Sequence, residues 1–238
     1  MNKNLKITLG TIYLEILISF LYFLCLKFYI ARIDDFSYYQ SIQANIEEGI
    51  GDKLIINLIL FFIFSLIWVV LLGFGSPILI LSGIFFGKWI GTLISIFSIS
   101  IGALCLYIIA SFFFTDLINY LLKEKFTKYI KKFQKNEFYY FLAFRLAGGL
   151  GTPFFLQNVM PVIFKMKNRN YFFSSFLGLL PHFFIWNSIG AGINKFIKNS
   201  DNFSLLNLML SNEIYMPLLI FLALIVTSII LRKKFFND

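Results

Sequence analysis

The sequence predicts an all-α polytopic membrane protein with about five transmembrane helices, two facing re-entrant hairpins and one amphipathic interfacial helix. Hydrophobic residues make up 59% of the 238 residues, and several apolar runs approach the roughly 20 residues that a helix needs to span a bilayer. Two further apolar stretches are interrupted by glycine and proline, which a straight helix does not favour. These observations favour one membrane-embedded domain without a separate soluble unit.

The first predicted element is a retained membrane helix over residues 5–30, because no small-residue cleavage site follows it. Lys3 and Lys6 precede this helix and favour a cytoplasmic N-terminus. Residues 31–53 carry five acidic and two basic side chains, which fits an external segment. Residues 1–53 therefore form a first unit.

The second unit, residues 54–193, is the predicted core and opens with a span over 54–74. The run 77–87 has eleven residues and would be about 16 Å long as a helix, too short to cross a bilayer. We interpret it as a first re-entrant hairpin that precedes a long span over 90–114. The residues predicted to form this hairpin are Pro77, Gly83, Gly87 and Gly91.

Residues 115–137 have a different character. Apolar side chains recur there at helical spacing opposite six lysines, which is typical of an amphipathic helix at the membrane surface. Such a helix either recruits anionic lipid or only anchors the protein.

The stretch 138–164 is apolar but contains Arg145 as its lone charge and a glycine and proline cluster at its centre. Non-helical backbone at membrane depth is tolerated only where protein or a water-filled cavity satisfies its polar groups. We therefore expect a second re-entrant hairpin that faces inward. The residues that shape it are Gly148, Gly149, Gly151, Pro153, Asn158 and Pro161.

A further span is predicted over 171–193, and Pro181 within it is counted with the hairpin-forming residues. Residues 194–238 form a third unit, a polar linker followed by a last span over 214–231 and a basic end. With the N-terminus inside, five crossings place the C-terminus and the 115–137 helix outside, against their charge. Either one hairpin penetrates further than assigned, or the charge bias is overridden.

Broken segments in corresponding positions of two halves indicate an inverted-repeat transporter design, with the site where the hairpins meet. Residues 77–91, followed by Gly102, resemble the first hairpin of the DedA superfamily in its VTT-domain branch, also called SNARE-associated Golgi proteins. The second hairpin and the span after it are similar to that branch at Arg145, Leu146, Pro153, Phe154, Asn158, Pro161, Gly178, Pro181 and Gly190.

The resemblance implies a multi-pass protein of the bacterial inner membrane, with relatives implicated in phospholipid scrambling and in moving undecaprenyl phosphate across the bilayer. The DedA proteins proper place acidic residues before and within the first hairpin and are thought to be proton-coupled, whereas residues 75–78 offer no carboxylate here. In that branch a proline commonly follows the arginine of the second hairpin, whereas here Gly148 and Gly149 occupy that place. These departures weaken the case for proton coupling and predict a different local geometry in the second hairpin.

Arg145 is the strongest candidate for the substrate path, because a lone guanidinium in an apolar segment is costly and its planar fork suits a lipid phosphate. The alternative is a structural arginine that bonds the free carbonyls of the hairpin. Asn158, Pro153 and Gly149 complete the predicted substrate-binding or translocation set. Asn158 and Asn187 are equally suited to bond a neighbouring helix.

His182 and Glu15 are the candidates for a proton relay. His182 follows a proline, and a lone histidine in that position more often bonds a carbonyl group that the proline leaves free than it carries a proton. Glu15 lies within the first span, where its position favours a pair with a lysine near the membrane interface over a relay role.

With one histidine, no clustered carboxylates and no thiol pair, the sequence favours no enzyme activity, no metal and no cofactor. The net charge of +9 is spread over loops, which fits anionic lipid head groups better than nucleic acid. We therefore expect a lipid translocase or scramblase that moves phospholipid or polyprenyl phosphate near Arg145. The alternatives are a proton- or ion-coupled transporter of small solutes and a non-transporting membrane-organising protein.

Overall fold

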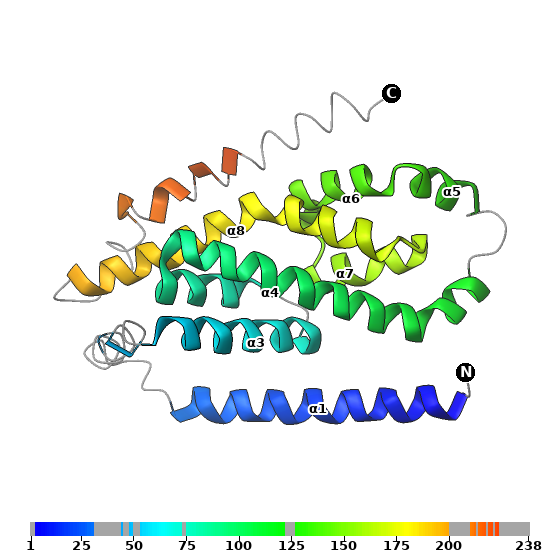
Figure 1. Ribbon diagram of the computed structural model, residues 1–238, viewed down its shortest axis with the longest axis horizontal. Helices are drawn as coiled ribbons and strands as arrows, with labels where there is room; N and C mark the ends of the chain where they lie inside the picture. The colour runs from blue at the N-terminus through cyan, green and yellow to red at the C-terminus, as the bar shows by residue number, and fades with distance from the viewer. Residues whose placement is uncertain are drawn as a thin grey trace.

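Helices of very different length lie along one long axis in this computed structural model (Figure 1). The structure describes residues 3–30, 44, 48–49, 53–72, 75–121, 127–199, 210–212, 214–217, 219–220 and 222–223. Every regular element within these residues is helical, which confirms the predicted all-helical class. Among the described residues, three stretches are long and apolar enough to cross a membrane, namely Leu54–Leu71, Ser76–Phe114 and Asn168–Lys198.

The first two helices, α1 (Lys3–Ile30) and α3 (Leu54–Leu72), agree with the first two predicted spans. The chain runs through them in opposite directions (Figure 1). The hydroxyl of Tyr13 in α1 donates a hydrogen bond to the carbonyl oxygen of Val70 in α3 at 2.9 Å. The external segment predicted over 31–53 lies almost entirely outside the described residues.

Helix α4 (Ser76–Leu121) contains a reversal of the chain at Gly87, where φ is 71° and ψ is 177°. Glycine adopts this backbone conformation without the steric cost that other residues meet. The hydroxyl of Ser82 donates to the carbonyl oxygen of Gly91 at 3.0 Å, although nine residues of straight helix would separate them by about 13 Å. The chain therefore folds back on itself. The short arm is 76–86 and the long arm is 88–121.

The long arm extends beyond the span predicted over 90–114, because it continues as helix to Leu121. After Gly102 no glycine or proline interrupts it, so no residue favours an earlier end. The prediction of one amphipathic helix over 115–137 is therefore wrong in its extent. The structure describes a separate helix, α5 (Thr127–Lys135), and residues 122–126 lie outside the described residues.

The broken stretch predicted over 138–164 folds as a series of short helical pieces. These are α6 (Glu137–Leu146), the 3₁₀ turn η2 (Gly148–Gly151), α7 (Phe154–Val159) and the 3₁₀ turn η3 (Met160–Phe164). Backbone φ is positive at each of the four residues of η2. Because three of those four residues are glycines, the chain turns there at little steric cost.

Helix α8 (Asn168–Asn199) is longer than the span predicted over 171–193, and the predicted polar linker begins inside it. The helix continues through Pro181, because its length packs extensively against α4. The two helices approach so closely at Gly190 that no side chain fits between them. A Cβ atom on Gly190 would lie 2.2 Å from the carbonyl oxygen of Ile80 in the short arm of α4. Most of the last span predicted over 214–231 lies outside the described residues.

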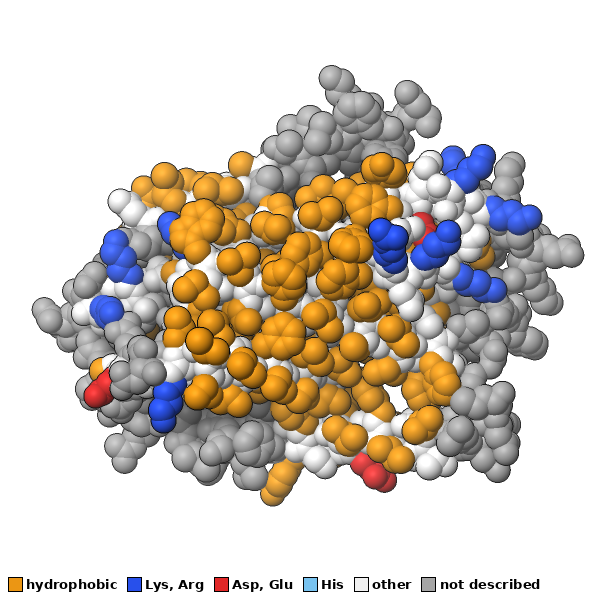
Figure 2. All heavy atoms as spheres, viewed as in Figure 1, with side chains coloured by type: hydrophobic (Ala, Val, Ile, Leu, Met, Phe, Trp, Pro, Cys, Tyr) orange, Lys and Arg blue, Asp and Glu red, His pale blue; other side chains and the backbone are white. Residues whose placement is uncertain are grey.

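The order of the helices along the long axis differs from the predicted topology. The beginning of α1, the end of α4, α5 and the beginning of α8 lie at one end of the molecule (Figure 1). The beginning of α3, the fold-back of α4 and the end of α8 lie at the other end. Because the short arm brings the chain back before the long arm departs, α5 lies at the same end as the N-terminus. A band of hydrophobic side chains separates two ends that carry Lys and Arg (Figure 2).

Candidate functional site

Arg145 lies in the last turn of α6 and is completely buried, with 0% of its surface exposed. Its Cβ atom packs against α8 at Gly178, where an added Cβ would lie only 2.5 Å away. A side chain larger than hydrogen at that position would therefore displace Arg145. Among the described residues, Arg145 and Glu137 are the buried charged side chains.

Three side chains accept hydrogen bonds from the guanidinium of Arg145. One terminal nitrogen donates to Oε1 of Gln157 at 3.1 Å, and the other donates to Oδ1 of Asn158 at 2.6 Å and to the hydroxyl of Tyr171 at 3.2 Å. Gln157 and Asn158 belong to α7 and Tyr171 to α8. The arginine therefore connects α6 to α7 and to α8.

Aromatic rings surround the same guanidinium. Its central carbon lies 4.8 Å from the ring centroid of Phe141, 5.3 Å from that of Phe154 and 5.8 Å from that of Tyr171. The negative faces of such rings attract a cation, most strongly where water is excluded. Tyr171 is itself stacked on Tyr107 of the long arm of α4, with ring centroids 4.5 Å apart.

Among the described residues, the cluster contains positive charge but no negative charge. Within the described part of the chain, Arg145 forms no ion pair, and all of its hydrogen-bond acceptors are neutral. Nε of Arg145 and Nδ2 of Asn158 are buried donors that find no acceptor among the described residues. Burial of a cation with only neutral partners is costly. The positive charge of Arg145 is therefore not compensated by any described side chain that it contacts.

The glycine-rich turn shapes this cluster through Gln157. Gly149 has φ 68°, and a Cβ on it would lie 2.1 Å from Cδ of Gln157. The amide nitrogen of Gln157 donates to the carbonyl oxygen of Thr152 at 2.7 Å, which fixes the amide with its oxygen toward Arg145. Gly149 thus permits the close contact that orients one partner of the arginine.

The structure brings together some of the predicted site residues and separates others. Arg145 and Asn158 are in direct contact. Gly149 packs against Gln157, which is another hydrogen-bond partner of Arg145. Pro153 is exposed at the beginning of α7 and is not among the hydrogen-bond partners or ring contacts of Arg145. The suggestion that Arg145 bonds free carbonyls is not borne out, because its hydrogen bonds go to side chains.

Gln157 and Tyr171 were not predicted as site residues. Gln157 precedes Asn158, so two adjacent amides in an apolar segment were an available signal. The sequence gives no such signal for Tyr171, because nothing distinguishes it from the other tyrosines among the twelve of the chain as a contact of Arg145.

The two candidates for a proton relay lie apart from the hydrogen bonds of Arg145. Nε2 of His182 accepts a hydrogen bond from the indole of Trp186 at 2.9 Å, one turn further along α8. Glu15 is exposed on α1. Neither side chain hydrogen-bonds to Arg145.

The predicted hairpin residues occupy different settings. Gly83 and Gly91 approach Asn187, whose Oδ1 is buried without a hydrogen-bond partner and would lie 2.5 Å from a Cβ on Gly91. The amide nitrogen of Asn187 donates to the carbonyl oxygen of Phe183 in its own helix at 2.9 Å, and not to a neighbouring helix. Pro77 is in the first turn of α4 and Pro161 is buried in η3.

Glu137 is a second buried charge that was not predicted as a functional residue. Its Oε1 accepts a hydrogen bond from the backbone nitrogen of Lys167 at 3.2 Å and another from Nδ2 of Asn170 at 2.7 Å. A carboxylate at a helix N-terminus is favoured by the helix dipole. Glu137 therefore joins the beginning of α6 to the beginning of α8.

Exposed basic residues surround this junction at the α5 end of the molecule. The ring of Phe133 stacks on Phe164 with centroids 4.4 Å apart, and Gln134 donates to the carbonyl oxygen of Phe164 at 3.0 Å. These contacts hold α5 beside the loop that precedes α8. The exposed cations that they bring together are Lys131, Lys132, Lys135, Lys165, Lys167 and Arg169.

Comparison with known families places most of these features in one domain. The family model of the VTT domain matches residues 69–192, slightly more than half of the chain. The matched residues include the fold-back of α4, the Arg145 cluster and most of α8. No solved structure matches the chain.

Proposed function

The chain belongs to the VTT-domain family of DedA and SNARE-associated Golgi proteins, and we propose that it is a lipid translocase or scramblase that moves phospholipid or polyprenyl phosphate between leaflets past Arg145. One observation carries this proposal. Arg145 is fully buried, and its hydrogen-bond partners within the described residues are all neutral. A lipid phosphate would supply the negative charge that the cluster lacks.

The chemistry of the barrier favours this assignment. An unsolvated phosphate crosses about 30 Å of hydrocarbon only at a large free-energy cost. The guanidinium offers a planar fork of donors that matches two phosphate oxygens. An ion pair with Arg145 would replace neutral acceptors by a charged one and lower the free energy of the head group inside the bilayer. The lipid tails would remain in the surrounding hydrocarbon.

The position of Arg145 along α8 supports a site within the bilayer. Its Cβ packs on Gly178, ten residues from the start of α8 at Asn168, or about 15 Å along the helix axis. That is about half of the hydrocarbon thickness. We place the stretch from α6 to η3 as a re-entrant hairpin, and we expect the short arm of α4 to bring the chain back to the end of the molecule opposite to the N-terminus before the long arm begins.

Access to the buried arginine requires a movement of the second hairpin. Because no part of Arg145 is exposed, a head group reaches it only when α6 and α7 separate from α8. The four residues of η2, all with positive φ, form the connection between α6 and α7. Glycine-rich connections absorb changes in φ and ψ at small cost, so η2 is the hinge that we assign to this opening.

The charge distribution supports an orientation in the membrane. Loops rich in lysine and arginine favour the cytoplasmic side. The beginning of α1, α5 and the loop before α8 lie at the same end of the molecule. We therefore place that end in the cytoplasm, in the inner membrane of a bacterium. The six exposed cations around α5 would then face the anionic leaflet.

The experiment that tests the function is leaflet exchange of fluorescent phospholipid in liposomes that contain the purified protein. Wild type is compared with Arg145→Ala, and Arg169→Ala serves as the control because Arg169 is exposed. We expect exchange with wild type and with Arg169→Ala and none with Arg145→Ala. Equal exchange by Arg145→Ala, folded as judged by gel filtration, would refute the role of the arginine. If no protein exceeds empty liposomes, phospholipid is excluded and polyprenyl phosphate is tested in the same format.

A further inference from the structure

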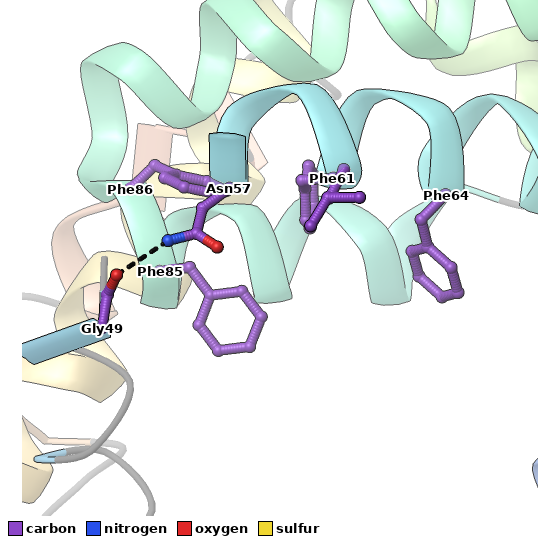
Figure 3. Close-up of a pocket in the computed structure, with 7 residues that line it drawn as sticks. Gly49, Asn57, Phe61, Phe64, Phe85 and Phe86 are labelled. Atoms are coloured by element: carbon purple, nitrogen blue, oxygen red, sulfur yellow. Dashed lines mark hydrogen bonds between the residues drawn. The ribbon is translucent and has the colours of Figure 1, made fainter. Parts of the chain in front are cut away.

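A pocket of about 390 Å³ lies between the beginning of α3 and the end of the short arm of α4. This volume is within the range of sites that bind small molecules. None of its lining residues contacts Arg145, so it is distinct from the cluster described above. The lining residues are Gly49, Asn57, Leu60, Phe61, Phe64, Phe85 and Phe86 (Figure 3).

Packed aromatic rings form the wall of the pocket. The ring of Phe61 makes edge-to-face contacts with Phe86 and Phe85, with centroids 5.2 and 6.4 Å apart. Phe85 and Phe86 contact each other in the same manner at 6.3 Å. Edge-to-face packing fixes the relative orientation of rings. The wall therefore exists before any ligand binds, and its surface is apolar.

The mouth of the pocket opens on the side of α3 that faces hydrocarbon. Leu60 and Phe64 line the pocket and are 59% and 38% exposed, and Figure 3 shows the ring of Phe64 directed toward the open side. Other exposed aliphatic residues continue this face of α3, namely Ile55, Ile56, Ile59, Ile63 and Ile67. In a membrane helix such a face contacts lipid tails, so a lipid chain is the molecule that meets the pocket.

One end of the pocket is polar. Nδ2 of Asn57 donates to the carbonyl oxygen of Gly49 at 2.9 Å, and Lys53, whose carbonyl oxygen accepts a hydrogen bond from the backbone nitrogen of Asn57, lies immediately before α3. Beyond the fold-back, Nζ of Lys88 lies 5.9 Å from the ring centroid of Trp89. Lysine and tryptophan side chains are typical of the membrane interface. The pocket thus extends from the interface toward the hydrocarbon.

We propose that this pocket binds one acyl chain of a bilayer phospholipid, with the head group beside Lys53 and Lys88. The site depends on insertion in a membrane and not on lipid transport through Arg145. Because Phe85 and Phe86 immediately precede the reversal at Gly87, the bound chain would contact the tip of the fold-back.

Photolabelling of the full-length protein in liposomes tests this site. The probe is phosphatidylcholine with a diazirine in one acyl chain, and the labelled residues are located by mass spectrometry of peptides. Leu60→Trp fills the mouth of the pocket. Ile59→Trp is the matched control, because Ile59 is 54% exposed on the same helix but does not line the pocket. We expect Leu60→Trp to lower labelling of Phe61, Phe85 and Phe86 about tenfold, and Ile59→Trp to leave it unchanged.

Three results would overturn the proposal. One is labelling that follows only exposure, so that the face of α3 and the exposed face of α8 are labelled equally. Another is equal labelling of the two tryptophan variants. The third is protection by excess polyprenyl phosphate without protection by unlabelled phospholipid. We expect Arg145→Met to keep the label, so a failure of leaflet exchange leaves this result standing. Loss of the label in a folded Arg145→Met protein would refute a local, preformed pocket.

Discussion

Arg145 and Asn158 meet across the glycine-rich turn, where the guanidinium donates to the amide oxygen at 2.6 Å. The donor is charged, and such hydrogen bonds are about twice as strong as neutral ones. The bond joins the last turn of α6 to α7, and Tyr171 extends the connection to α8. One cation therefore holds together three elements of the second half of the protein.

Replacing Arg145 by methionine separates a structural role from a functional one. Asn158 keeps a donor, because the hydroxyl of Tyr171 lies 3.2 Å from its Oδ1, whereas Gln157 loses its donor for Oε1. One unsatisfied buried acceptor costs about 1–3 kcal/mol. We expect Arg145→Met to fold with a modest loss of thermal stability in detergent and to lose leaflet exchange.

The companion variant, Arg145→Lys, keeps the charge but not the planar fork. We expect it to fold and to exchange lipid about tenfold more slowly than wild type. Failure of both variants to fold would identify Arg145 as a structural residue. Full exchange by Arg145→Met would refute the proposed path.

Asn158 and Tyr171 should contribute unequally to the stability of the cluster. Asn158→Ala removes the 2.6 Å bond from the cation, and hydrogen bonds to charged groups contribute about 1.5–3 kcal/mol. Tyr171→Phe removes the longer bond from the cation at 3.2 Å and the bond that the hydroxyl donates to Oδ1 of Asn158 at 3.2 Å, but it keeps the ring stack with Tyr107, so we expect a loss at the lower end of this range, about 1.5 kcal/mol. Thermal unfolding in one detergent measures both. The reverse order would show that the hydroxyl of Tyr171 is the main acceptor.

Two neighbouring glycines distinguish backbone strain from close packing. Gly148 and Gly149 have φ of 65° and 68°, so alanine at either position is strained by about 1–2 kcal/mol. A Cβ on Gly148 meets nothing within 4 Å, whereas a Cβ on Gly149 would overlap Gln157. We expect Gly149→Ala to lose about 1–3 kcal/mol more than Gly148→Ala and to slow leaflet exchange. Equal stability of the two variants would mean that Gln157 moves away without cost.

The sequence predicted those parts of the molecule that stand out chemically against an apolar background. Arg145, Asn158 and the glycines of η2 are exceptions within a hydrophobic stretch, and the structure places them in or beside one cluster. Gly87 was expected to form a hairpin, and the chain reverses there. Each of these residues has a free-energy cost in a straight apolar helix, and only a particular local structure removes that cost. Its presence in the sequence therefore predicts that local structure.

The partners of those residues could not be predicted in the same way. Tyr171 meets Arg145 only because α8 crosses α6 with Gly178 at the contact, and this crossing depends on tertiary packing. Glu137 looked like part of a charged surface helix, yet it is 3% exposed and bonds the beginning of α8. The length of the long arm was also underestimated, because helix length in an uninterrupted sequence depends on packing.

The orientation of the two ends gives a prediction on which the sequence and the structure disagree. Five crossings with a short first hairpin place Lys88 inside the cell and Lys165 outside. In the structure the fold-back of α4 lies at the end opposite to the N-terminus, and the beginning of α8 lies at the same end as the N-terminus. With a cytoplasmic N-terminus, Lys88 is then outside and Lys165 inside. Both side chains are exposed.

Single cysteines at positions 88 and 165 show on which side of the membrane each end lies, after Cys25 and Cys105 are replaced by serine. We expect a membrane-impermeant maleimide to label Lys88→Cys on intact cells and to label Lys165→Cys only after the membrane is opened. The physical reason is that the short arm returns the chain to the end of the molecule at which α3 begins, before the long arm departs, so the basic residues around α5 stay on the cytoplasmic side. The opposite pattern would show that the short arm does not return the chain to the far side of the membrane. Labelling of both cysteines on intact cells would show that the two ends are not separated by the membrane.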